Sequence, residues 1–530
     1  MAAAIAVIRK KDSNKIRLIV DHSLRDSRGK LHGVNAITSL ESLPPIELPS
    51  LDRILRDWKA DPSHKVAVVD IQEAYRHLRL APTIQPLRYR VGNMIVIDQA
   101  APMGAAGSAH TMQAVVRAVL FALKRKFPSI YGAVYIDDIL LKGSSPEIDA
   151  AYACLLSWLE RINLPPSPAK LQPPQDSVTY LGINLSTRTQ EASWTREKQQ
   201  DALVRLQRVR RHLDKVVRSN RNAPESLCAE CRCLAGKLQA VCLLCPPLRA
   251  FLRGLSVLGS FAKGRPKRGA PVRFIGDAIP APGPEIVSPR RSPAHAEPAR
   301  ARLRWSSGVA LRQIRHIEKI LRTQLCRDLQ PQPDDSHFVV YSDASTRGGG
   351  AVIYDAHGDL VAAIYVTLPR FEAPNISAAE MIVPATILRL RHMPWCEIAR
   401  PRLTWFMDNA AGVCVLTQWA AKTREMAAIN EDIAHSVIDG GISTQWQFIA
   451  GAENVNADRI SRLEPQPSED AIRAALRPQH APPAAAGGNG SDGSMPTIHR
   501  IRAPRSLTKL LFAHGSPEQE KTQAEASTPR

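Results

Sequence analysis

The 530-residue chain lacks the features of several classes of protein. No apolar run approaches the ~20 residues that span a bilayer, and only 5% of the residues are aromatic. The start, MAAAIAVIRKK, places its charges after a short apolar run, the reverse of a secretory signal. Nine unevenly spaced cysteines, an odd number, do not form a complete disulfide framework. These absences predict an intracellular protein of the cytoplasm or nucleus, with reduced thiols and no membrane partner.

Positive charge is the strongest signal in the composition. The formal net charge is +20, and 44% of the residues are hydrophobic. A large positive charge favours a polyanionic partner, with nucleic acid first and an anionic membrane surface second. The hydrophobic content is sufficient for true cores, and the length gives room for about three or four domains of ~150 residues.

Composition and periodicity divide the chain into six predicted segments. The helical segments are recognised by apolar residues at a spacing of three and four, the linker by eight prolines among basic and small residues, and the tail by Pro, Ala, Gly and Ser. The segments are an alternating α/β region at 1–185, helices at 186–262, a linker at 263–300, helices at 301–335, a compact α/β domain at 336–463 and a disordered tail at 464–530.

Two adjacent aspartates interrupt an apolar run in the first segment, AVYIDDILLKG. One interpretation is a β-hairpin with Asp137 and Asp138 at its turn. The other is a divalent-cation site on that turn, since ionised carboxylates are costly to bury unless they are paired or bind metal. Upstream, Val66–Val69 predict a buried strand that ends at Asp70. Three carboxylates that converge there have the chemistry to hold two Mg²⁺ ions for phosphoryl transfer.

Five stretches of the first segment resemble, in order, the motifs of reverse transcriptases. They are IRKKDSNKIRLIVD for the fingers hairpin, VVDIQEAY, APMGAAGSA and YIDD for the palm, and VTYLGINL for the primer grip. The resemblance covers roughly residues 5–185. It implies a right-hand polymerase of mixed α/β (α+β) class, with fingers and palm in residues 1–185 and a helical thumb-like region in residues 186–262.

The same resemblance implies roles for individual residues. Asp70, Asp137 and Asp138 would bind two Mg²⁺ ions, with Mn²⁺ as an alternative ion. Tyr75 would abut the sugar of the incoming dNTP and exclude a 2′-hydroxyl. The other implied substrate contacts are Lys10 or Lys11 with Arg17 at the triphosphate, Met103 and Gly104 beside the nucleotide, and Lys170 near the leaving pyrophosphate. Plain surface positions for the basic residues and core packing for the tyrosine are the alternatives.

Four acids follow successive predicted elements of residues 336–463. Asp343 ends a strand, Glu380 lies in the first turns of a helix, Asp408 follows a strand, and Asp458 lies on a helix after the loop GAENVNAD. The set resembles the RNase H domain of retroelements and implies a second site with two Mg²⁺ ions that hydrolyses RNA with water as the nucleophile. That loop has no histidine, and Pro384 is expected to kink the helix of Glu380.

A cysteine-rich stretch, CAECRCLAGKLQAVCLLC, contains CxxC twice, a spacing seen in zinc sites. Its apolar residues and half of its thiols nevertheless recur at helical spacing. Packed helices are therefore favoured over a zinc site.

We interpret the sequence as a retrotransposon reverse transcriptase with RNase H, of LTR-type or DIRS-like kind. Its expected partners are an RNA template, a DNA primer, dNTPs and an RNA–DNA hybrid. A degenerate element protein that only binds nucleic acid and another palm polymerase are the alternatives. The seven acids argue against the first, and Tyr75 with the nuclease quartet argues against the second. The sequence gives no indication of oligomeric state.

Overall fold

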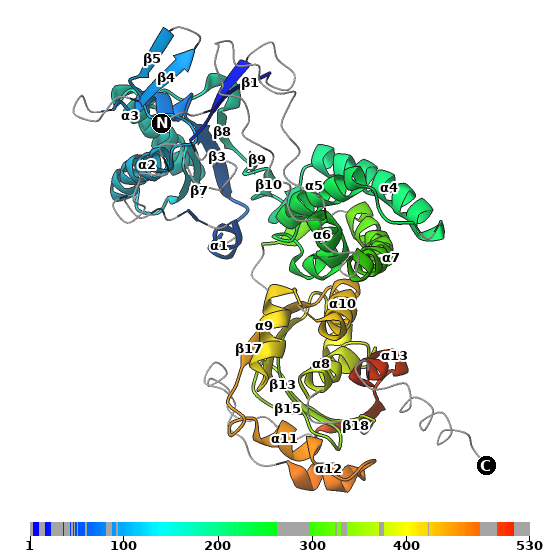
Figure 1. Cartoon of the computed structure of the whole chain (residues 1–530). Coiled ribbons are helices and arrows are strands. Elements are labelled where there is room, and N and C mark those ends of the chain that lie inside the picture. Colours follow the sequence, from blue (N-terminus) through cyan, green and yellow to red (C-terminus); the bar gives the residue numbers. More distant parts are fainter. Residues whose placement is uncertain are drawn as a thin grey trace. The chain divides into compact units, whose positions relative to one another are not determined.

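The computed structural model describes most of the chain, and the remaining residues are grey in Figure 1. The described residues are 4–9, 16–22, 51–58, 61–80, 87–91, 94–219, 221–261, 296–323, 326–329, 336–369, 376–421, 423–476, 495–512 and a few single positions between 35 and 49. The chain forms two compact units. The first comprises residues 1–201, 263–301 and 323–331, and the second comprises residues 202–262, 302–322 and 332–530. Among the described helices, none has the length and apolarity to cross a membrane.

The first unit is built on an antiparallel sheet with strand order β6-β7-β3-β8. Its strands are β6 (Tyr131–Tyr135), β7 (Asp138–Ser144), β3 (His64–Asp70) and β8 (Gln172–Gln175). Two amphipathic helices, α2 (Ala106–Lys126) and α3 (Ser145–Arg161), contact each other and the sheet. Alternate strand residues such as Ala67 and Val69 pack against Met112 and Leu155 of these helices. This core supports the strand ends that carry the predicted acids.

Smaller elements complete the first unit. A hairpin of β1 (Ala4–Arg9) and β2 (Ile16–Asp21) and a hairpin of β4 (Leu87–Val91) and β5 (Met94–Asp98) each form a two-stranded sheet. A second four-stranded sheet has the order β12-β11-β10-β9. Its strands are β9 (Ser177–Tyr180), β10 (Ile183–Ser186), β11 (Glu191–Trp194) and β12 (Cys326–Asp328). The short helices are α1 (Leu51–Arg56), η3 (Ala74–His77) and η4 (Pro168–Lys170).

Two predicted boundaries need correction here. Residues 186–262 were expected to be helical, but β11 lies within them. Its alternation of half-buried and buried residues is too short to stand out in the sequence. Residues 301–335 were also expected to be helical, but Cys326–Asp328 pairs with β11 as β12. A three-residue strand has almost no signal of its own and is defined by its partner.

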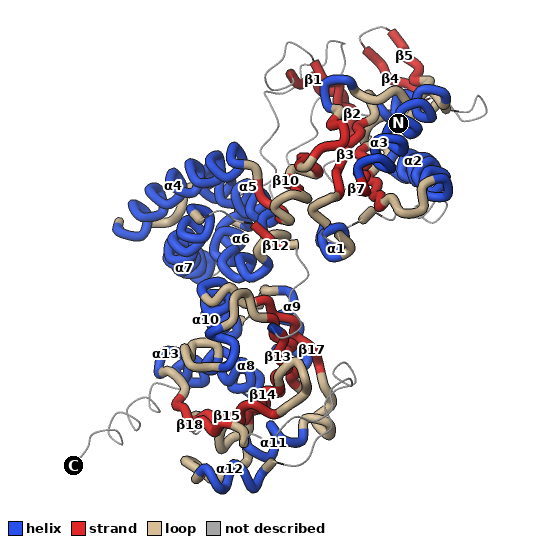
Figure 2. The backbone as a smooth tube through the Cα atoms, turned by 180° about the vertical axis from the view of Figure 1, so that it is seen from behind, coloured by secondary structure: helices blue, strands red, loops and turns tan. Residues whose placement is uncertain are grey.

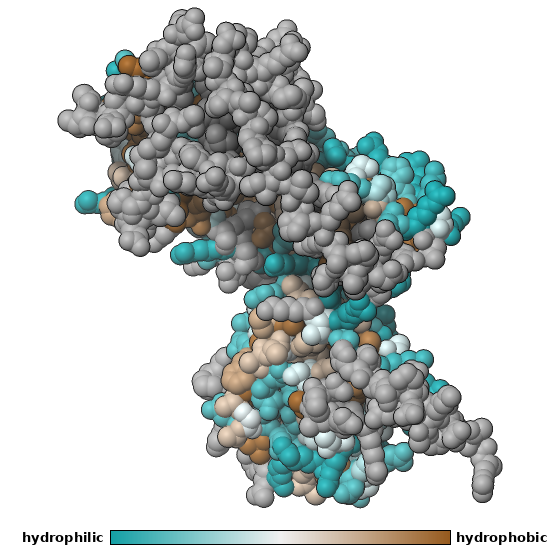
Figure 3. All heavy atoms as spheres, viewed as in Figure 1, coloured by the Kyte–Doolittle hydropathy of each residue, from teal (hydrophilic) through white to brown (hydrophobic). Residues whose placement is uncertain are grey.

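The helical part of the second unit contains α4 to α7. Their bounds are α4 (Arg196–Arg218), whose first residues belong to the first unit, α5 (Glu225–Val241), η5 (Pro246–Leu252), α6 (Arg253–Ser260) and α7 (Ala296–Arg322). The buried stripe of α4 contains Leu206, Val209 and Leu213, and the surface over this helix is hydrophilic (Figure 3). Since α7 begins at Ala296, the predicted linker at 263–300 is shorter than expected, and its residues 263–295 lie outside the described residues.

The cysteine-rich stretch forms α5 and the turn that follows it. Cys228 and Cys231 are buried on the inner stripe of α5, and Cys242 is buried just after it. Burial raises the pKa of Cys231 and of Cys242 to about 12. Because metals bind the thiolate, this environment favours neutral thiols that pack as small apolar groups.

The rest of the second unit is a six-stranded sheet with order β17-β16-β13-β14-β15-β18. Strands β13 (His337–Ala344), β14 (Gly349–Tyr354) and β15 (Leu360–Thr367) are antiparallel neighbours, while β16 (Arg402–Met407), β17 (Ser443–Phe448) and β18 (Thr497–Arg502) join in parallel. Helices of the second unit lie on both faces of this six-stranded sheet (Figure 2). The longer helices are α8 (Ile376–Ile387), α9 (Ala410–Gln418), α10 (Arg424–Asp439), α11 (Val455–Ser461) and α12 (Glu469–Ala475), with η9 (Pro394–Glu397), α13 (Arg505–Thr508) and η11 (Lys509–Phe512) as short turns.

The predicted disordered tail at 464–530 is wrong in two places. Residues 469–475 form α12, and β18 pairs with β15 along its whole length, from Ala362 opposite Thr497 to Thr367 opposite Arg502. The stretch TIHRIR has only two aliphatic residues and follows a Pro/Ala/Gly-rich stretch, so its composition predicted a continuation of the tail. Its strand conformation depends on the edge of β15, which the sequence alone does not reveal. Residues 477–494 and 513–530 lie outside the described residues.

Candidate active sites

A first acid cluster, Asp70, Asp137 and Asp138, lies at one end of the β6-β7-β3-β8 sheet. β3 ends at Asp70 and β7 begins at Asp138, and the two residues are directly opposite in the antiparallel register. Asp137 lies in the turn before β7, where its carbonyl accepts a hydrogen bond of 3.1 Å from the backbone N–H of Ile71. The predicted strand and hairpin therefore place all three residues at the same end of the sheet. Asp138 is the first residue of β7 rather than part of the turn.

The turn that carries Asp137 is strained and is held by a side chain that the sequence did not reveal. Ile136 has φ of 58°, a left-handed conformation that costs a non-glycine residue about 1–2 kcal/mol. The buried Gln113 of α2 accepts a 2.6 Å hydrogen bond from the backbone N–H of Ile136 and donates a 3.1 Å bond to the carbonyl of Val134. The available signal was a glutamine at helical spacing from Val116 and Leu120 on the buried face of the helix.

The electrostatics of the first acid cluster reflect unbalanced negative charge. Burial, reinforced by repulsion from Asp137 and Asp70, raises the pKa of Asp138 to about 7. Burial also raises the pKa of Asp137, with a further contribution from Asp70. Lys170 partly opposes these effects, because its Nζ lies 2.7 Å from Asp70 Oδ2. Carboxylate oxygens are the ligands that Mg²⁺ prefers, and a divalent cation would neutralise the remaining charge. As described, the three acids do not place one oxygen each within 4.8 Å of the others.

Tyr75 and Lys170 both lie near the first acid cluster. Tyr75 lies in η3, half-buried against the core of the unit, and burial together with the charge of Asp137 raises its pKa. The predicted triphosphate contacts are less well described. Lys10 and Lys11 lie outside the described residues, and Arg17 lies in β2 opposite Ile8.

Met103 and Gly104 lie in the turn before α2. Met103 is 52% exposed, which leaves its side chain accessible to a ligand. Gly104 has φ of 99°, and a Cβ at this position would lie 3.2 Å from the carbonyl oxygen of Val20. The glycine is therefore required by the backbone itself, because side chains disfavour this conformation.

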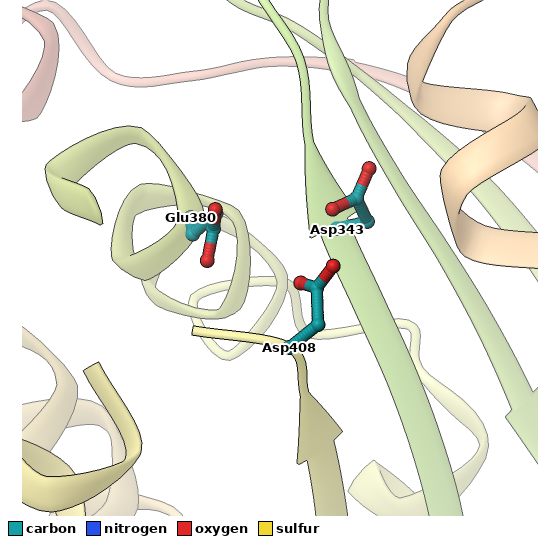
Figure 4. A group of neighbouring side chains, drawn as sticks. All are labelled: Asp343, Glu380 and Asp408. Carbon is teal, nitrogen blue, oxygen red and sulfur yellow. The ribbon is translucent and has the colours of Figure 1, made fainter. Parts of the chain in front are cut away.

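A second acid cluster, Asp343, Glu380 and Asp408, lies in the six-stranded domain (Figure 4). Asp343 is near the end of β13, Glu380 is on α8, and Asp408 directly follows β16, the parallel neighbour of β13. One carboxylate oxygen from each lies within 4.8 Å of the others, and among the described residues this is the group with the spacing of a metal site. Pro384 lies inside α8, four residues after Glu380, yet Glu380 still reaches the other two acids.

Asp458, the fourth predicted acid, does not belong to this closest group. It lies on α11, which packs directly on β14 because Gly350 has no side chain: a Cβ there would lie 2.2 Å from the carbonyl oxygen of Ala457. Arg462 Nε donates a 2.7 Å hydrogen bond to Asp458 Oδ1, and Nη2 of the same guanidinium forms an ion pair with that oxygen at 2.7 Å. Asp458 nevertheless lies near enough for its charge to raise the pKa of Asp343 and of Asp408.

The second acid cluster also holds uncompensated charge. Burial, followed by repulsion from the neighbouring acids, raises the pKa of Glu380 to about 8, and burial raises that of Asp343 to about 7. Glu380 Oε2 and Asp408 Oδ1 are buried and have no hydrogen-bond partner. Buried, unpartnered carboxylate oxygens within a few ångströms of one another are the donor set that a divalent cation satisfies.

These pKa values predict how the stability of the metal-free protein varies with pH. A carboxyl whose pKa is raised on folding makes the folded protein less stable as pH rises. For Glu380 the full stability is present below its unfolded pKa, near 4.5, and is lost as pH rises through its folded pKa of about 8. In EDTA at pH 8, Glu380→Gln should therefore raise the melting temperature of the domain built on the six-stranded sheet by roughly 2–8 °C, the shift expected for about 1–2 kcal/mol. At pH 5 the unsubstituted protein and Glu380→Gln should have the same melting temperature. Equal melting at both values would contradict the proposed repulsion.

Comparison with known proteins bears on the first unit. Residues 8–185 match the model of the family described as reverse transcriptase (RNA-dependent DNA polymerase). This segment resembles reverse transcriptases. Over 192 residues the chain is 29% identical to the Gag-Pol polyproteins of avian leukosis virus subgroup A (isolate RSA) and Rous sarcoma virus subgroup C (strain Prague). Each alignment covers 34% of this chain, which spans only 11% of the length of either relative.

Solved structures of foamy viral protease-reverse transcriptase are also similar to the chain. The complex of its dRH form with double-stranded DNA is 16% identical, with a TM-score of 0.40 over 84% of this chain and 65% of that one. The complex with an RNA/DNA hybrid is 14% identical, with a TM-score of 0.38 over 91% of this chain and 53% of that one. The family match confirms the reverse transcriptase resemblance of the first segment, whereas the LTR-type or DIRS-like assignment stays a prediction.

Proposed function

We propose that the chain is an RNA-directed DNA polymerase of a retroelement, of LTR-type or DIRS-like lineage, that also hydrolyses the RNA strand of RNA–DNA hybrids. The observation that carries the proposal is the pairing of Asp70 with Asp138 across two strands of a segment that matches reverse transcriptases. The second acid cluster, on a separate sheet of the second unit, supports the nuclease.

In the polymerase, Asp70, Asp137 and Asp138 would hold two Mg²⁺ ions. When bound, these ions would activate the primer 3′-hydroxyl and stabilise the leaving pyrophosphate. Gln113 fixes the turn that aims Asp137, and the pairing of β3 with β7 fixes Asp70 against Asp138. The ammonium group of Lys170, held at Asp70, lies where it can offset phosphate charge.

In the nuclease, Asp343, Glu380, Asp408 and Asp458 would hold two Mg²⁺ ions. When bound, these ions would supply an activated water and stabilise the leaving oxygen of a phosphodiester. The protein orients its acids by hydrogen bonds: Ser461 Oγ donates to Asp343 Oδ2 at 2.6 Å, and a side-chain bond from Asn409 lowers the pKa of Glu380. We propose residues 202–262 as the thumb-like part and 302–322 as the connection.

Two assays of the full chain test the proposal. In the first, a DNA primer on an RNA template is incubated with Mg²⁺ and either dNTPs or rNTPs. In the second, a preformed hybrid with a labelled RNA strand is incubated without nucleotides. We expect extension with dNTPs and cleavage of the RNA, both abolished by EDTA. Extension only with rNTPs would indicate a different polymerase, and binding without either reaction would indicate a nucleic-acid-binding protein.

Tyr75 should set the choice between deoxy- and ribonucleotides. An aromatic ring against the sugar excludes a 2′-hydroxyl by steric clash. Tyr75→Ala should therefore increase the ratio of ribonucleotide to deoxynucleotide incorporation by about tenfold or more, which corresponds to about 1.4 kcal/mol of discrimination. Single-nucleotide extension kinetics measure this ratio. Tyr75→Phe keeps the ring and serves as the matched control, and an unchanged ratio in Tyr75→Ala would make Tyr75 a packing residue.

A further inference from the structure

The C-terminal end of α11 contacts two acids of the nuclease site through consecutive residues. Ser461, which is fully buried, donates its hydroxyl to Asp343 Oδ2 at 2.6 Å. Arg462, the next residue, donates from Nε to Asp458 Oδ1 and forms an ion pair with it through Nη2, and its side chain is 67% exposed. One contact is therefore locked in the core, whereas the other involves a side chain that can leave for solvent without opening the fold.

Arg462 pairs with the one predicted acid that lies outside the second acid cluster. The guanidinium occupies Asp458 Oδ1, and Asp458 is the predicted ligand that is not part of the group within 4.8 Å. The charge of Arg462 also lowers the pKa of Asp343 and of Asp408, so it reaches two acids of the cluster. Ion pairs with this much solvent exposure are weak and exchange readily.

We propose that Arg462 is a positioning residue that holds Asp458 away from the second acid cluster until a divalent cation binds. It acts as an exchangeable counter-ion, because the guanidinium and a divalent cation compete for the negative charge of the same carboxylate. Metal binding at Asp458 therefore competes with the arginine. This inference rests on the proposed nuclease site, and it assigns to Arg462 a role in loading that site rather than in the chemical step.

The test is a calorimetric titration of the full chain with Mn²⁺, in a background of Asp137→Asn that weakens the first acid cluster. Arg462→Gln should tighten binding at the second cluster by about threefold, the order expected for an exposed ion pair. The matched control is Arg218→Gln on α4. Arg218 also pairs with an aspartate at i−4, at 2.7 Å, and that aspartate is as exposed as Asp458, at 32%. The control should leave the titration unchanged.

A double-mutant cycle makes the inference specific. In Asp458→Asn the pair is already broken, so adding Arg462→Gln should tighten Mn²⁺ binding less than it does with Asp458 present, because only the charge effect on Asp343 and Asp408 remains. Arg462→Lys keeps the charge but loses the two-nitrogen contact with Asp458 Oδ1, so it should tighten binding less than Arg462→Gln, and it replaces that variant if Arg462→Gln does not fold. The role of Arg462 would be overturned if Arg462→Gln and Arg462→Lys bound Mn²⁺ no more tightly than their parent. It would also be overturned if Arg462→Gln tightened Mn²⁺ binding equally in the presence and absence of Asp458.

The experiment also separates this inference from the proposed nuclease site. Asp408→Asn should remove the Mn²⁺ binding assigned to the second cluster. If Asp408→Asn titrates like its parent, there is no metal site at this cluster and the proposed function fails together with the inference. If Asp408→Asn removes the binding and Arg462→Gln leaves it unchanged, only the inference about Arg462 is overturned.

Discussion

Asp137→Asn should abolish DNA synthesis while cleavage of a preformed RNA–DNA hybrid persists, and Asp408→Asn should do the reverse. Each substitution removes a carboxylate ligand from one acid cluster, and the two clusters draw their acids from different sheets in different units. Loss of a ligand weakens nucleophile activation and leaving-group stabilisation together, so we expect a decrease on the order of a thousandfold in the affected activity. The other activity should change by a few-fold at most, through shared binding of the nucleic acid.

The measurement is primer extension and hybrid cleavage on the unsubstituted protein, the two active-site variants and a control variant. Both substitutions are nearly isosteric and neutralise an acid whose pKa is raised by burial, so folding should survive, and thermal melting can verify this. Asp149→Asn, an exposed position of α3, is the matched control and should keep both activities. If either active-site substitution eliminated both activities in folded protein, the interpretation of two independent sites would be wrong.

Truncation after residue 476 should destabilise the domain built on the six-stranded sheet and abolish the proposed hybrid cleavage, whereas truncation after residue 512 should have little effect. The segment between these points contains β18, which covers the edge of β15, and the buried residues Ala503, Leu507 and Leu511. Its two last turns, α13 and η11, pack on α8, the helix that carries Glu380. Burial of a leucine side chain contributes about 1.5–3 kcal/mol, so loss of the segment removes several kcal/mol and the support of α8.

Point substitutions provide a finer version of this prediction. Leu511→Asp places a charge in the buried contact and should lower the melting temperature of the domain by several degrees, while Lys509→Asp changes charge at an exposed position of the same turn. Hybrid cleavage should decrease with the first substitution and persist with the second. The polymerase activity of both variants should be unchanged, which would show that the first unit is intact. A cleavage-competent, stable protein truncated after residue 476 would show that β18 does not support the site.

The sequence was sufficient for those parts of the sites that depend on local pattern. Asp70 could be placed because a buried strand ends there, and Asp138 because a double aspartate interrupts a hairpin. Asp343 and Asp408 followed from strands of the same kind. In each case the position of the acid at a strand end decides which residues meet, and strand ends can be recognised from a few apolar neighbours.

The residues that orient the acids could not be found in this way. Gln113 is one polar residue in a helix, and its importance comes from the strained turn at Ile136, 23 residues later in the chain. Arg462 has the sequence context of an ordinary surface arginine until α11 is seen packed on Gly350. β18 depends on an edge formed by a strand far upstream. Such contacts are tertiary, and neither propensity nor periodicity encodes the partner.

The pairing of β12 with β11 has a consequence for synthesis of the protein. The chain leaves the first unit after α4 begins, forms helices of the second unit, and returns to add Cys326–Asp328 to the sheet that contains β11. At ribosomal elongation rates, the edge of β11 therefore remains unpaired for roughly 10 s until its partner strand has been synthesised. An exposed strand edge is a template for pairing with other chains. The nascent protein is thus most prone to misassociate in the interval before residue 326 emerges, which ties correct folding of the first unit to elongation through the second.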